Sequence, residues 1–126
     1  KMNIIASNRP FPNRKVLHPI LLEQRILEYK PEYIFFPFWS WKVPKEVTDK
    51  YKCIGFHTGE INGGSPIQNL IRLGVENTVI RVFRLNDKID GGEIIDRLPI
   101  SLLGSLEEII LRQSNLINDY IQKNYR

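Results

Sequence analysis

The sequence predicts an α/β domain with a Rossmann-like, mainly parallel sheet flanked by helices, followed by a β-hairpin and a long C-terminal helix. Three observations predict it. Short apolar runs alternate with helical patterns, two β-branched runs then flank a glycine-containing turn, and a helix-capping pattern opens the last segment. With 126 residues, 42% of them hydrophobic, the chain can build one core and is too short for two. Residues 1–126 are therefore expected to form a single domain.

Three apolar runs predict the parallel strands of this sheet. They are Met2–Ala6, Tyr33–Phe36 and Cys53–Phe56. The second run is unbroken, which is typical of a strand buried on both faces of a parallel sheet, and Pro37 is expected to end it. The segment Phe11–His18 lies between prolines and is expected to be a loop.

Three helices are expected between and after these strands. The first follows Pro19, a residue that suits a first helical turn, and a short second helix spans Pro44–Lys50. The stripe of the first helix comprises Ile20, Leu21, Gln24, Ile26 and Leu27. The third helix has Ser65 as a possible N-cap, Pro66 at its first position and Gly74 as its stop. Its expected buried stripe comprises Ile67, Leu70, Ile71 and Leu73.

The remainder of the chain predicts a hairpin and a long helix. Thr78–Leu85 and Glu93–Leu98 have strand character, and Asp87–Gly92 indicates the turn between them. Ser105 and Glu108 have the spacing of a capping box, which predicts an amphipathic helix running nearly to the C-terminus. Its expected apolar face comprises Leu106, Ile109, Ile110, Leu116, Ile117, Tyr120 and Ile121.

Composition and spacing exclude several classes of function. The net charge is +4, but the basic residues are scattered, so we expect a solvated surface that can steer an anionic substrate. The single cysteine, Cys53, lies in a predicted strand and is expected to be a small core residue of a cytoplasmic protein. No apolar run has membrane-spanning length, and two histidines with one cysteine give no zinc signature. Dinucleotide-binding, P-loop and serine-esterase motifs do not occur in the sequence.

Three features carry candidate chemistry, and each has a structural alternative. His57 follows a predicted strand, where an imidazole can transfer protons near neutral pH, although a hydrogen-bonded structural histidine fits equally well. Asp90 is followed by two glycines that permit close backbone approach, although a hairpin turn alone explains this pattern. The aromatic run Phe35–Trp41 can stack on a flat ring, or can serve as strand core and a partly buried lid. His18, between prolines, is expected to be a surface residue.

Ligands of parallel α/β sheets bind outside the carboxyl ends of the strands. In this chain the segments at those ends are Ser7–Pro10, Pro37–Lys42 and His57–Gly64. We therefore expect these three segments to meet at the site, with the hairpin turn folded over the same edge.

Three stretches resemble the formyltransferase family that uses 10-formyltetrahydrofolate. They are a strand ending in His57 before Gly63-Gly64-Ser65-Pro66, the strand and turn Val82–Ile95 with a pattern close to Leu-Asp-x-Gly, and Phe36–Pro44 in the place of the folate-binding loop. The resemblance covers about Tyr33 to Ile110 and implies a formyltransferase-like catalytic domain, a one-carbon group transferase that uses 10-formyltetrahydrofolate. The tract Tyr33–Trp41 is most similar to the small branch that acts on sugar-nucleotide amines.

The resemblance implies a role for particular residues. His57 is implied to be the acid–base residue or the imidazolium that stabilises the tetrahedral intermediate, and Asp90 is implied to orient it and manage the amine proton. The residues implied to hold the folate are Trp39, Ser40, Trp41, Lys42, Val43, Asn86, Asp87 and Ile89. Those implied to lie near the acceptor are Asn8, Asn62, Gly63, Gly64, Ser65 and Gln68.

The expected reaction moves a formyl group to a primary amine on a nucleotide-linked amino sugar. Nucleic acid and membranes are not expected as partners, because no RNA-binding domain follows Arg126 and the basic residues are scattered. Two alternatives stay open: a methionyl-tRNA formyltransferase-like enzyme, and a folate- or nucleotide-binding module that has lost turnover. Gly55 motivates the second, because the family usually has there an asparagine that donates to the oxyanion. Asn8 or Asn62 could replace that donor, and the short His57–Pro66 loop leaves open whether the chain is complete.

Overall fold

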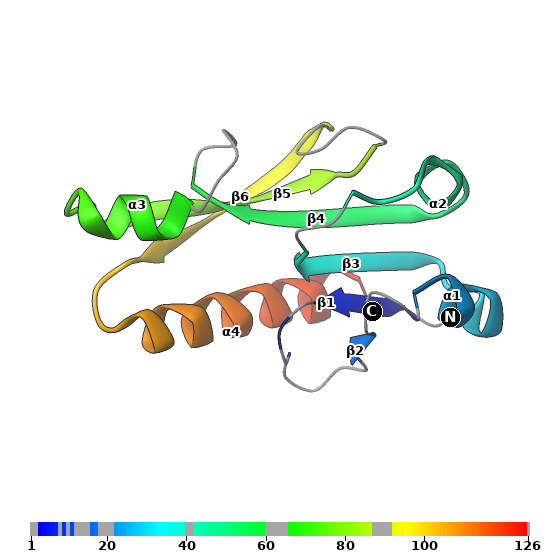
Figure 1. The fold of residues 1–126 in the computed structure, drawn as a ribbon, viewed down its shortest axis with the longest axis horizontal. Helices are drawn as coiled ribbons and strands as arrows, with labels where there is room; N and C mark the ends of the chain where they lie inside the picture. Colours follow the sequence, from blue (N-terminus) through cyan, green and yellow to red (C-terminus); the bar gives the residue numbers. More distant parts are fainter. Residues whose placement is uncertain are drawn as a thin grey trace.

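The computed structural model describes residues 3–7, 9, 11, 16–17, 22–39, 42–59, 66–86 and 92–125. Its strands are β1 (Ile4–Ser7), β2 (Val16–Leu17), β3 (Tyr33–Phe38), β4 (Lys52–Thr58), β5 (Asn77–Arg84) and β6 (Ile94–Ser101). They form one six-stranded sheet in the order β2-β1-β3-β4-β5-β6 (Figure 1). The first four strands are parallel, whereas β5 is antiparallel to both β4 and β6. The predicted α/β class, with a mainly parallel sheet and a hairpin, is confirmed.

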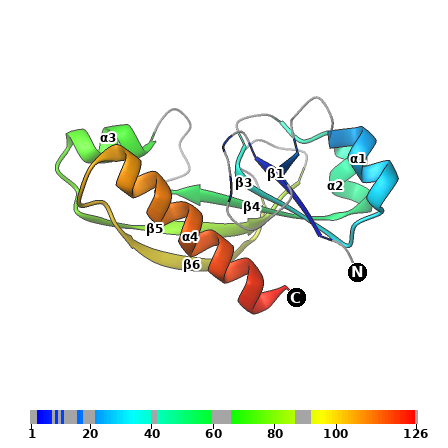
Figure 2. The ribbon, with the colours of Figure 1, turned by 90° about the horizontal axis from the view of Figure 1, so that it is seen from below.

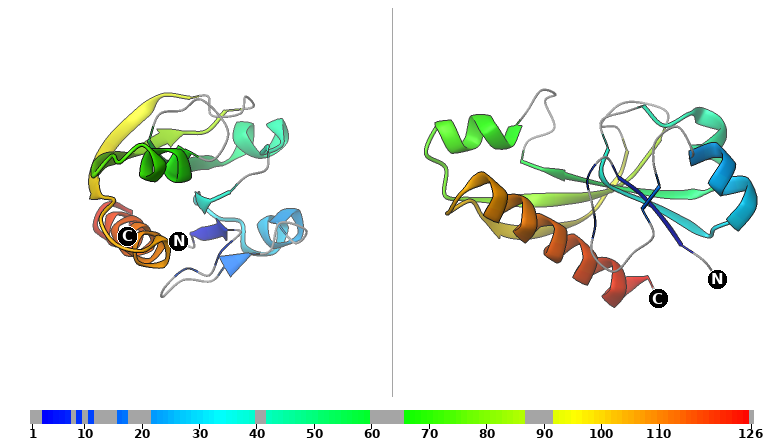
Figure 3. Two further views of the ribbon diagram at one scale, coloured as in Figure 1. Left: turned by 60° about the vertical axis from the view of Figure 1, so that its left-hand side comes forward. Right: turned by 60° about the horizontal axis from the view of Figure 1, so that its bottom comes forward.

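Helices lie against both faces of the sheet (Figures 2 and 3). Those within the described residues are α1 (Leu22–Tyr29), α2 (Lys45–Lys50), α3 (Pro66–Arg72) and α4 (Leu106–Asn124). α4 crosses one face, whereas α1 and α2 pack on the other. Within the described part of the chain, no helix combines the length and apolar character that crossing a bilayer requires.

The central strands are buried on both faces because their side chains alternate between two hydrophobic cores. The core beside α1 and α2 contains Ile4, Ala6, Leu22, Ile26, Ile34, Phe36, Val43, Val47 and Cys53. The core beneath α4 contains Ile5, Phe11, Phe35, Ile54, Phe56, Ile80, Val82, Ile100, Ile117 and Ile121. Since both faces are covered, β3 and β4 need apolar residues at successive positions, which explains the unbroken runs in the sequence.

Pro37 does not end its strand, contrary to the prediction. The register advances two residues along β1, from Ile5 to Ser7. Over the same distance β3 advances three residues, from Phe35 to Phe38. Pro37 therefore lies in a β-bulge, where its missing N–H leaves no ladder hydrogen bond unmade. The predicted loop before the first helix also contains β2, a two-residue strand too short to produce a sequence pattern.

The other predicted strands and helices are present, with ends shifted by a few residues, but the short helices bury less than predicted. α1 buries Leu22 and Ile26, whereas Leu27 is 74% exposed. In α3 the predicted stripe divides into half-buried Ile67 and Leu70 and exposed Ile71 and Leu73. A helix of two turns that touches the sheet along one line buries only the residues on that line. Residues 19–21, predicted to open the first helix, lie outside the described residues.

The capping box of α4 is confirmed. The backbone N–H of Glu108 donates to Ser105 Oγ at 3.2 Å, and the backbone N–H of Ser105 donates to the Glu108 carboxylate at 2.9 Å. These hydrogen bonds lower the pKa of Glu108 below its ordinary value. Two of the four backbone donors that a helix N-terminus leaves open are thereby satisfied at the first turn.

The apolar face of α4 is confirmed only in part. Ile109, Ile117 and Ile121 are buried, but Leu106 is 42% exposed. The helix also buries three polar residues that the apolar pattern did not predict, namely Gln113, Ser114 and Asn118. The Ser114 hydroxyl donates to the carbonyl of Ile110, one turn earlier in the helix.

Cys53 is fully buried in the core, as predicted, and burial raises the pKa of its thiol to about 12. We expect iodoacetamide to leave Cys53 unmodified in the native protein at pH 8 and to modify it completely in denaturant, as measured by mass spectrometry. Because the folded pKa is raised above the ordinary value of 9.0, this thiol contributes stability below pH 9 that is lost as the pH rises toward 12. Native-state labelling at the rate of a free thiol would contradict this.

Candidate active site

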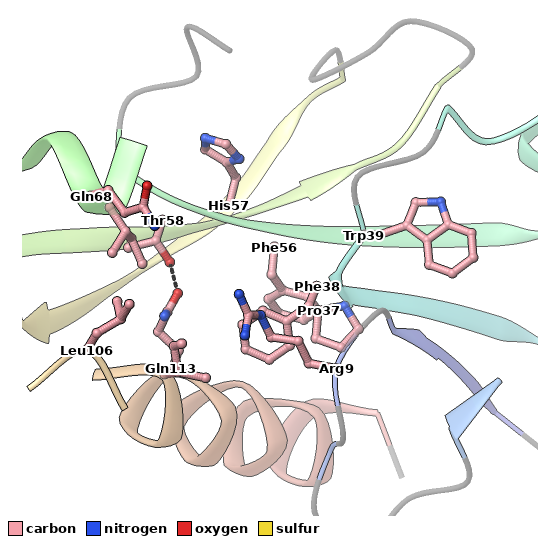
Figure 4. A pocket seen from close by; sticks show the side chains of 12 residues that line it. Arg9, Pro37, Phe38, Trp39, Phe56, His57, Thr58, Gln68, Leu106 and Gln113 are labelled. Atoms are coloured by element: carbon pink, nitrogen blue, oxygen red, sulfur yellow. Dashed lines mark hydrogen bonds between the residues drawn. The ribbon is translucent and has the colours of Figure 1, made fainter. Parts of the chain in front are cut away.

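The carboxyl ends of β1, β3 and β4 meet at a cavity of about 250 Å³ (Figure 4). It is lined by Arg9, Pro37, Phe38, Trp39, Phe56, His57, Thr58, Ile67, Gln68, Leu106, Ile110 and Gln113. These residues follow β1, end or follow β3, end β4, or belong to α3 and the first half of α4. The prediction that the three strand-end segments meet is therefore confirmed for their described residues.

His57 is the penultimate residue of β4 and is half-buried at the wall of the cavity. Its Cα pairs with that of Arg81 on β5. Figure 4 shows the imidazole on one side of β4 and the side chains of Thr58 and Gln113 on the other, as the alternation along a strand requires. His57 lines the cavity and is half-buried, so a bound molecule can reach this residue, a condition for proton transfer.

A buried hydrogen bond lies on the other side of β4. The Thr58 hydroxyl donates to Gln113 Oε1 at 2.6 Å. Thr58 is 7% exposed and Gln113 is 4% exposed. This contact joins the end of the strand that carries His57 to α4, so it fixes the position of α4 relative to the candidate site.

Arg9 brings a positive charge to the cavity from the loop after β1. Its backbone is held by Ser7, whose hydroxyl accepts from the Arg9 N–H at 3.1 Å and donates to the Arg9 carbonyl at 2.7 Å. Ser7 itself is buried. The turn is thus fixed by its own chain, and the exposed guanidinium raises the local concentration of anions at the mouth of the cavity.

The space beside Gly55 is filled by an aromatic ring. Gly55 is two residues before His57, on the same face of β4, and pairs with Phe83 on β5. A Cβ at position 55 would lie only 2.7 Å from Phe83 Cζ. The side-chain donor that the family resemblance implies at this position is therefore absent, and the phenyl ring occupies the room it would need.

Some of the proposed site residues lie at the cavity and others do not. Trp39 and Gln68 line it together with His57. Among the described residues, Lys42, Val43 and Asn86 do not line it; Val43 is buried in the core beside α1, and Lys42 and Asn86 are exposed. The other site predictions lie outside the described residues: Asn8, Ser40, Trp41, Asn62, Gly63, Gly64, Ser65, Asp87, Ile89 and Asp90. The proximity of His57 and Asp90 therefore stays a prediction.

The hairpin turn is described only at its final residue. Gly92 has φ +127°, and a Cβ there would lie 1.7 Å from the carbonyl oxygen of Arg84. Only glycine permits this approach of two backbones. Gly92, one of the two glycines after Asp90, thus has the expected role of permitting close backbone approach. It lies next to the hydrogen bond from the backbone N–H of Arg84 to the carbonyl oxygen of Glu93, which is 2.8 Å long.

Sequence reasoning missed three polar residues of the cavity, namely Arg9, Thr58 and Gln113. Arg9 lay in an expected ligand segment but has a common surface residue type. Thr58 follows the predicted end of its strand, and Gln113 interrupts an apolar helical face at a position that faces the sheet. A polar residue within an otherwise apolar helical face was the signal from which Gln113 could have been identified. Within the described residues, no group of histidine, cysteine, aspartate and glutamate side chains could hold a metal ion.

By sequence, the first curated relatives of this chain are methionyl-tRNA formyltransferases. No family model matches the chain. The methionyl-tRNA formyltransferase of Bacillus subtilis strain 168 is 31% identical over 84 residues, which are 63% of this chain and 26% of that enzyme. For the first two curated relatives, the matched segment is 26–31% of the relative's length, so this chain matches less than a third of each.

Solved structures also share the fold of this chain. The methionyl-tRNA formyltransferase from Clostridium thermocellum superposes with a TM-score of 0.83 and 32% identity, over 98% of this chain and 64% of that one. HypX from Aquifex aeolicus, in complex with tetrahydrofolic acid, superposes with a TM-score of 0.65 over 98% of this chain and 27% of that one. At 18% identity, HypX shows only that the fold is shared.

The contact of Gly55 with Phe83 predicts coupled mutations. Gly55→Ala is expected to lower the free energy of unfolding by about 1–3 kcal/mol, because the added methyl group displaces the phenyl ring. Phe83→Leu, which shortens that ring, is expected to recover about 1 kcal/mol or more of the loss in the double variant. Urea denaturation of the four proteins measures this coupling.

A distant pair supplies the control for that cycle. Ser105→Ala removes a helix cap that has no contact with Phe83, so its effect should add to that of Phe83→Leu. Strict additivity of Gly55→Ala and Phe83→Leu would show that the ring can move aside at no cost and would contradict the prediction.

Proposed function

Because this chain belongs to the formyltransferase family by sequence and by fold, we propose that it transfers a formyl group from 10-formyltetrahydrofolate to a primary amine. The observation that carries the proposal is the superposition of 98% of the chain on the Clostridium thermocellum enzyme at 32% identity. The cavity at the carboxyl ends of the strands supports it, because His57 lines that cavity.

His57 is the residue we propose for proton transfer. An amine that attacks a formyl carbon must lose a proton, and the carbonyl oxygen becomes negatively charged as the new C–N bond forms. His57, half-buried at the cavity wall, accepts the amine proton or, as the imidazolium, stabilises that oxygen. Asp90 orients the imidazole in this proposal.

The described residues fit a flat folate ring. When bound, 10-formyltetrahydrofolate supplies the electrophilic formyl carbon. Pro37, Phe38 and Trp39 form an apolar wall of the cavity, and the Trp39 indole packs edge-on against Phe36 with ring centroids 5.3 Å apart. Trp39 Nε1 is buried with no hydrogen-bond partner among the described residues. We propose that this wall holds the folate, together with the backbone of Ser40, Trp41, Asp87 and Ile89.

The acceptor we propose is methionyl-tRNA, the substrate that the named relatives carry in their names. A nucleotide-linked amino sugar, expected from the aromatic tract Tyr33–Trp41, is not supported by the comparisons. The expectation that nucleic acid is not a partner conflicts with them as well. The scattered basic residues then serve to attract the RNA backbone, with Gln68 and the loop before α3 near the aminoacyl end. The buried free thiol of Cys53 supports a cytoplasmic location.

The test is release of tetrahydrofolate from 10-formyltetrahydrofolate in the presence of methionyl-tRNA. We expect release by the wild-type protein, and His57→Ala is expected to lower kcat/KM at least 100-fold while leaving the thermal midpoint nearly unchanged. Asp90→Asn should lower it in the same direction. His18→Ala, a histidine expected at the surface, is the matched control and should retain full activity.

Other outcomes separate the alternatives. Release only with a nucleotide-linked amino sugar would restore the first expectation about the acceptor. Folate binding without release on any amine would favour a module that has lost turnover, as Gly55 suggests. If folded protein binds no folate, the proposed reaction is wrong.

A further inference from the structure

We propose that two arginines beside His57, Arg81 on β5 and Arg97 on β6, bind the phosphate groups at the 3′ end of an aminoacylated RNA. We call these two residues the arginine pair. The inference rests on the proposed function and names the surface that holds its acceptor. The ligand class is an RNA phosphodiester backbone.

The register of the strands places the arginine pair next to His57. The Cα of His57 pairs with that of Arg81, and the Cα of Arg81 pairs with that of Arg97. Residues directly opposite each other in an antiparallel pair share a face of the sheet, with Cβ atoms about 5 Å apart. The three side chains therefore lie in one line on one face. This line runs from the cavity that His57 lines to β6, the last strand in the order of the sheet.

The face that carries the arginine pair is the one opposite α4. Figure 4 shows the His57 imidazole on the side of β4 away from Gln113, a residue of α4. Arg81 is half-buried, whereas Arg97 is exposed. Pro99, two residues after Arg97 on the same face, is exposed as well. This face of β6 is thus open to a molecule from solvent.

The strands place charges of one sign on this face. Asp96 is the one acidic residue within β4, β5 and β6, all three of which the structure describes. It pairs with Val82, whose side chain belongs to the core beneath α4, so Asp96 lies on the opposite face from the arginine pair. Like charges directly opposite each other weaken a strand pair, and an anion bound between the two arginines offsets that repulsion.

The chemistry of an aminoacylated RNA suits this arrangement. The amino acid is joined by an ester to the last ribose, and the phosphate of that nucleotide lies on the other side of the same sugar. An acceptor whose amine is held at His57 therefore brings its first phosphate to Arg81, on the adjacent strand, and its second toward Arg97. Guanidinium groups bind phosphate oxygens through two parallel hydrogen bonds. Such contacts position a nucleic acid without reading its sequence.

Binding of a short RNA tests the arginine pair without turnover. The probe is a fluorescently labelled single-stranded RNA of about eight nucleotides, a typical length for one binding surface. Its dissociation constant is measured by fluorescence anisotropy at several salt concentrations. Arg97→Gln is expected to raise this constant about 3- to 10-fold at low salt and to reduce the steepness of its salt dependence by about 0.7, the loss of one phosphate contact. Arg81→Gln should act in the same direction.

Arg84→Gln is the matched control. It removes the same charge from β5, but Arg84 pairs with Ile54, whose side chain lies in the core beneath α4, so it is on the other face. Its dissociation constant for the RNA should change less than about 2-fold. The thermal midpoint of each variant is measured alongside. Because Arg97 is exposed, Arg97→Gln is expected to fold normally and carries the test even if Arg81→Gln is unstable.

The outcomes separate this inference from the proposed function. If the substitutions in the arginine pair weaken RNA binding but the wild-type protein transfers no formyl group, the pair binds RNA and the proposed reaction is what fails. If formyl transfer to methionyl-tRNA occurs while RNA affinity and KM are unchanged in Arg81→Gln and Arg97→Gln, the role of the pair is overturned. Equal weakening by Arg84→Gln would also overturn it, because the attraction would then come from net charge alone.

Discussion

Burial of β3 and β4 on both faces is the constraint on which the rest of the structure depends. Their side chains alternate between the core beside α1 and the core beneath α4, and Phe35, Ile34 and Ile54 are almost entirely inaccessible. Two packed faces hold the strands side by side in parallel register, so their carboxyl ends finish together. The cavity exists because chain segments leaving those ends have no neighbouring strand to continue into. The site is thus a consequence of core packing.

The two faces of β4 also give His57 two different surroundings. On its own face, the ring of Phe83 fills the space beside Gly55 and presents an apolar surface along the strand. On the opposite face, the hydrogen bond of Thr58 to Gln113 brings a polar group into a largely apolar wall. Alternation along the strand therefore places the neighbouring side chains of His57 and Thr58 on opposite faces of the sheet.

The sequence predicted those parts of the fold that depend on local patterns. Apolar runs, β-branched runs and the Ser105 capping box gave the strands, the hairpin and α4, because propensity and tertiary packing agree there. The strand through Pro37 was missed because the bulge that accommodates proline is set by pairing with β1. Gln113 was missed because a single polar residue in an apolar face has no periodic signature. For the site, the meeting of three strand ends and the position of His57 at the cavity were predictable from topology, whereas the proximity of Asp90 stays a prediction.

The packing of Phe83 changes how Gly55 must be interpreted. Considered alone, a glycine at this position is a lost side-chain donor, which would suggest a decayed site. In the structure Gly55 and Phe83 pack as a pair. The phenyl ring of Phe83 occupies the space that a larger side chain at position 55 would fill. The shape of this pair matters for stability, since an unfilled gap beside Gly55 would cost packing energy. Restoring a donor at position 55 therefore requires a second change at position 83.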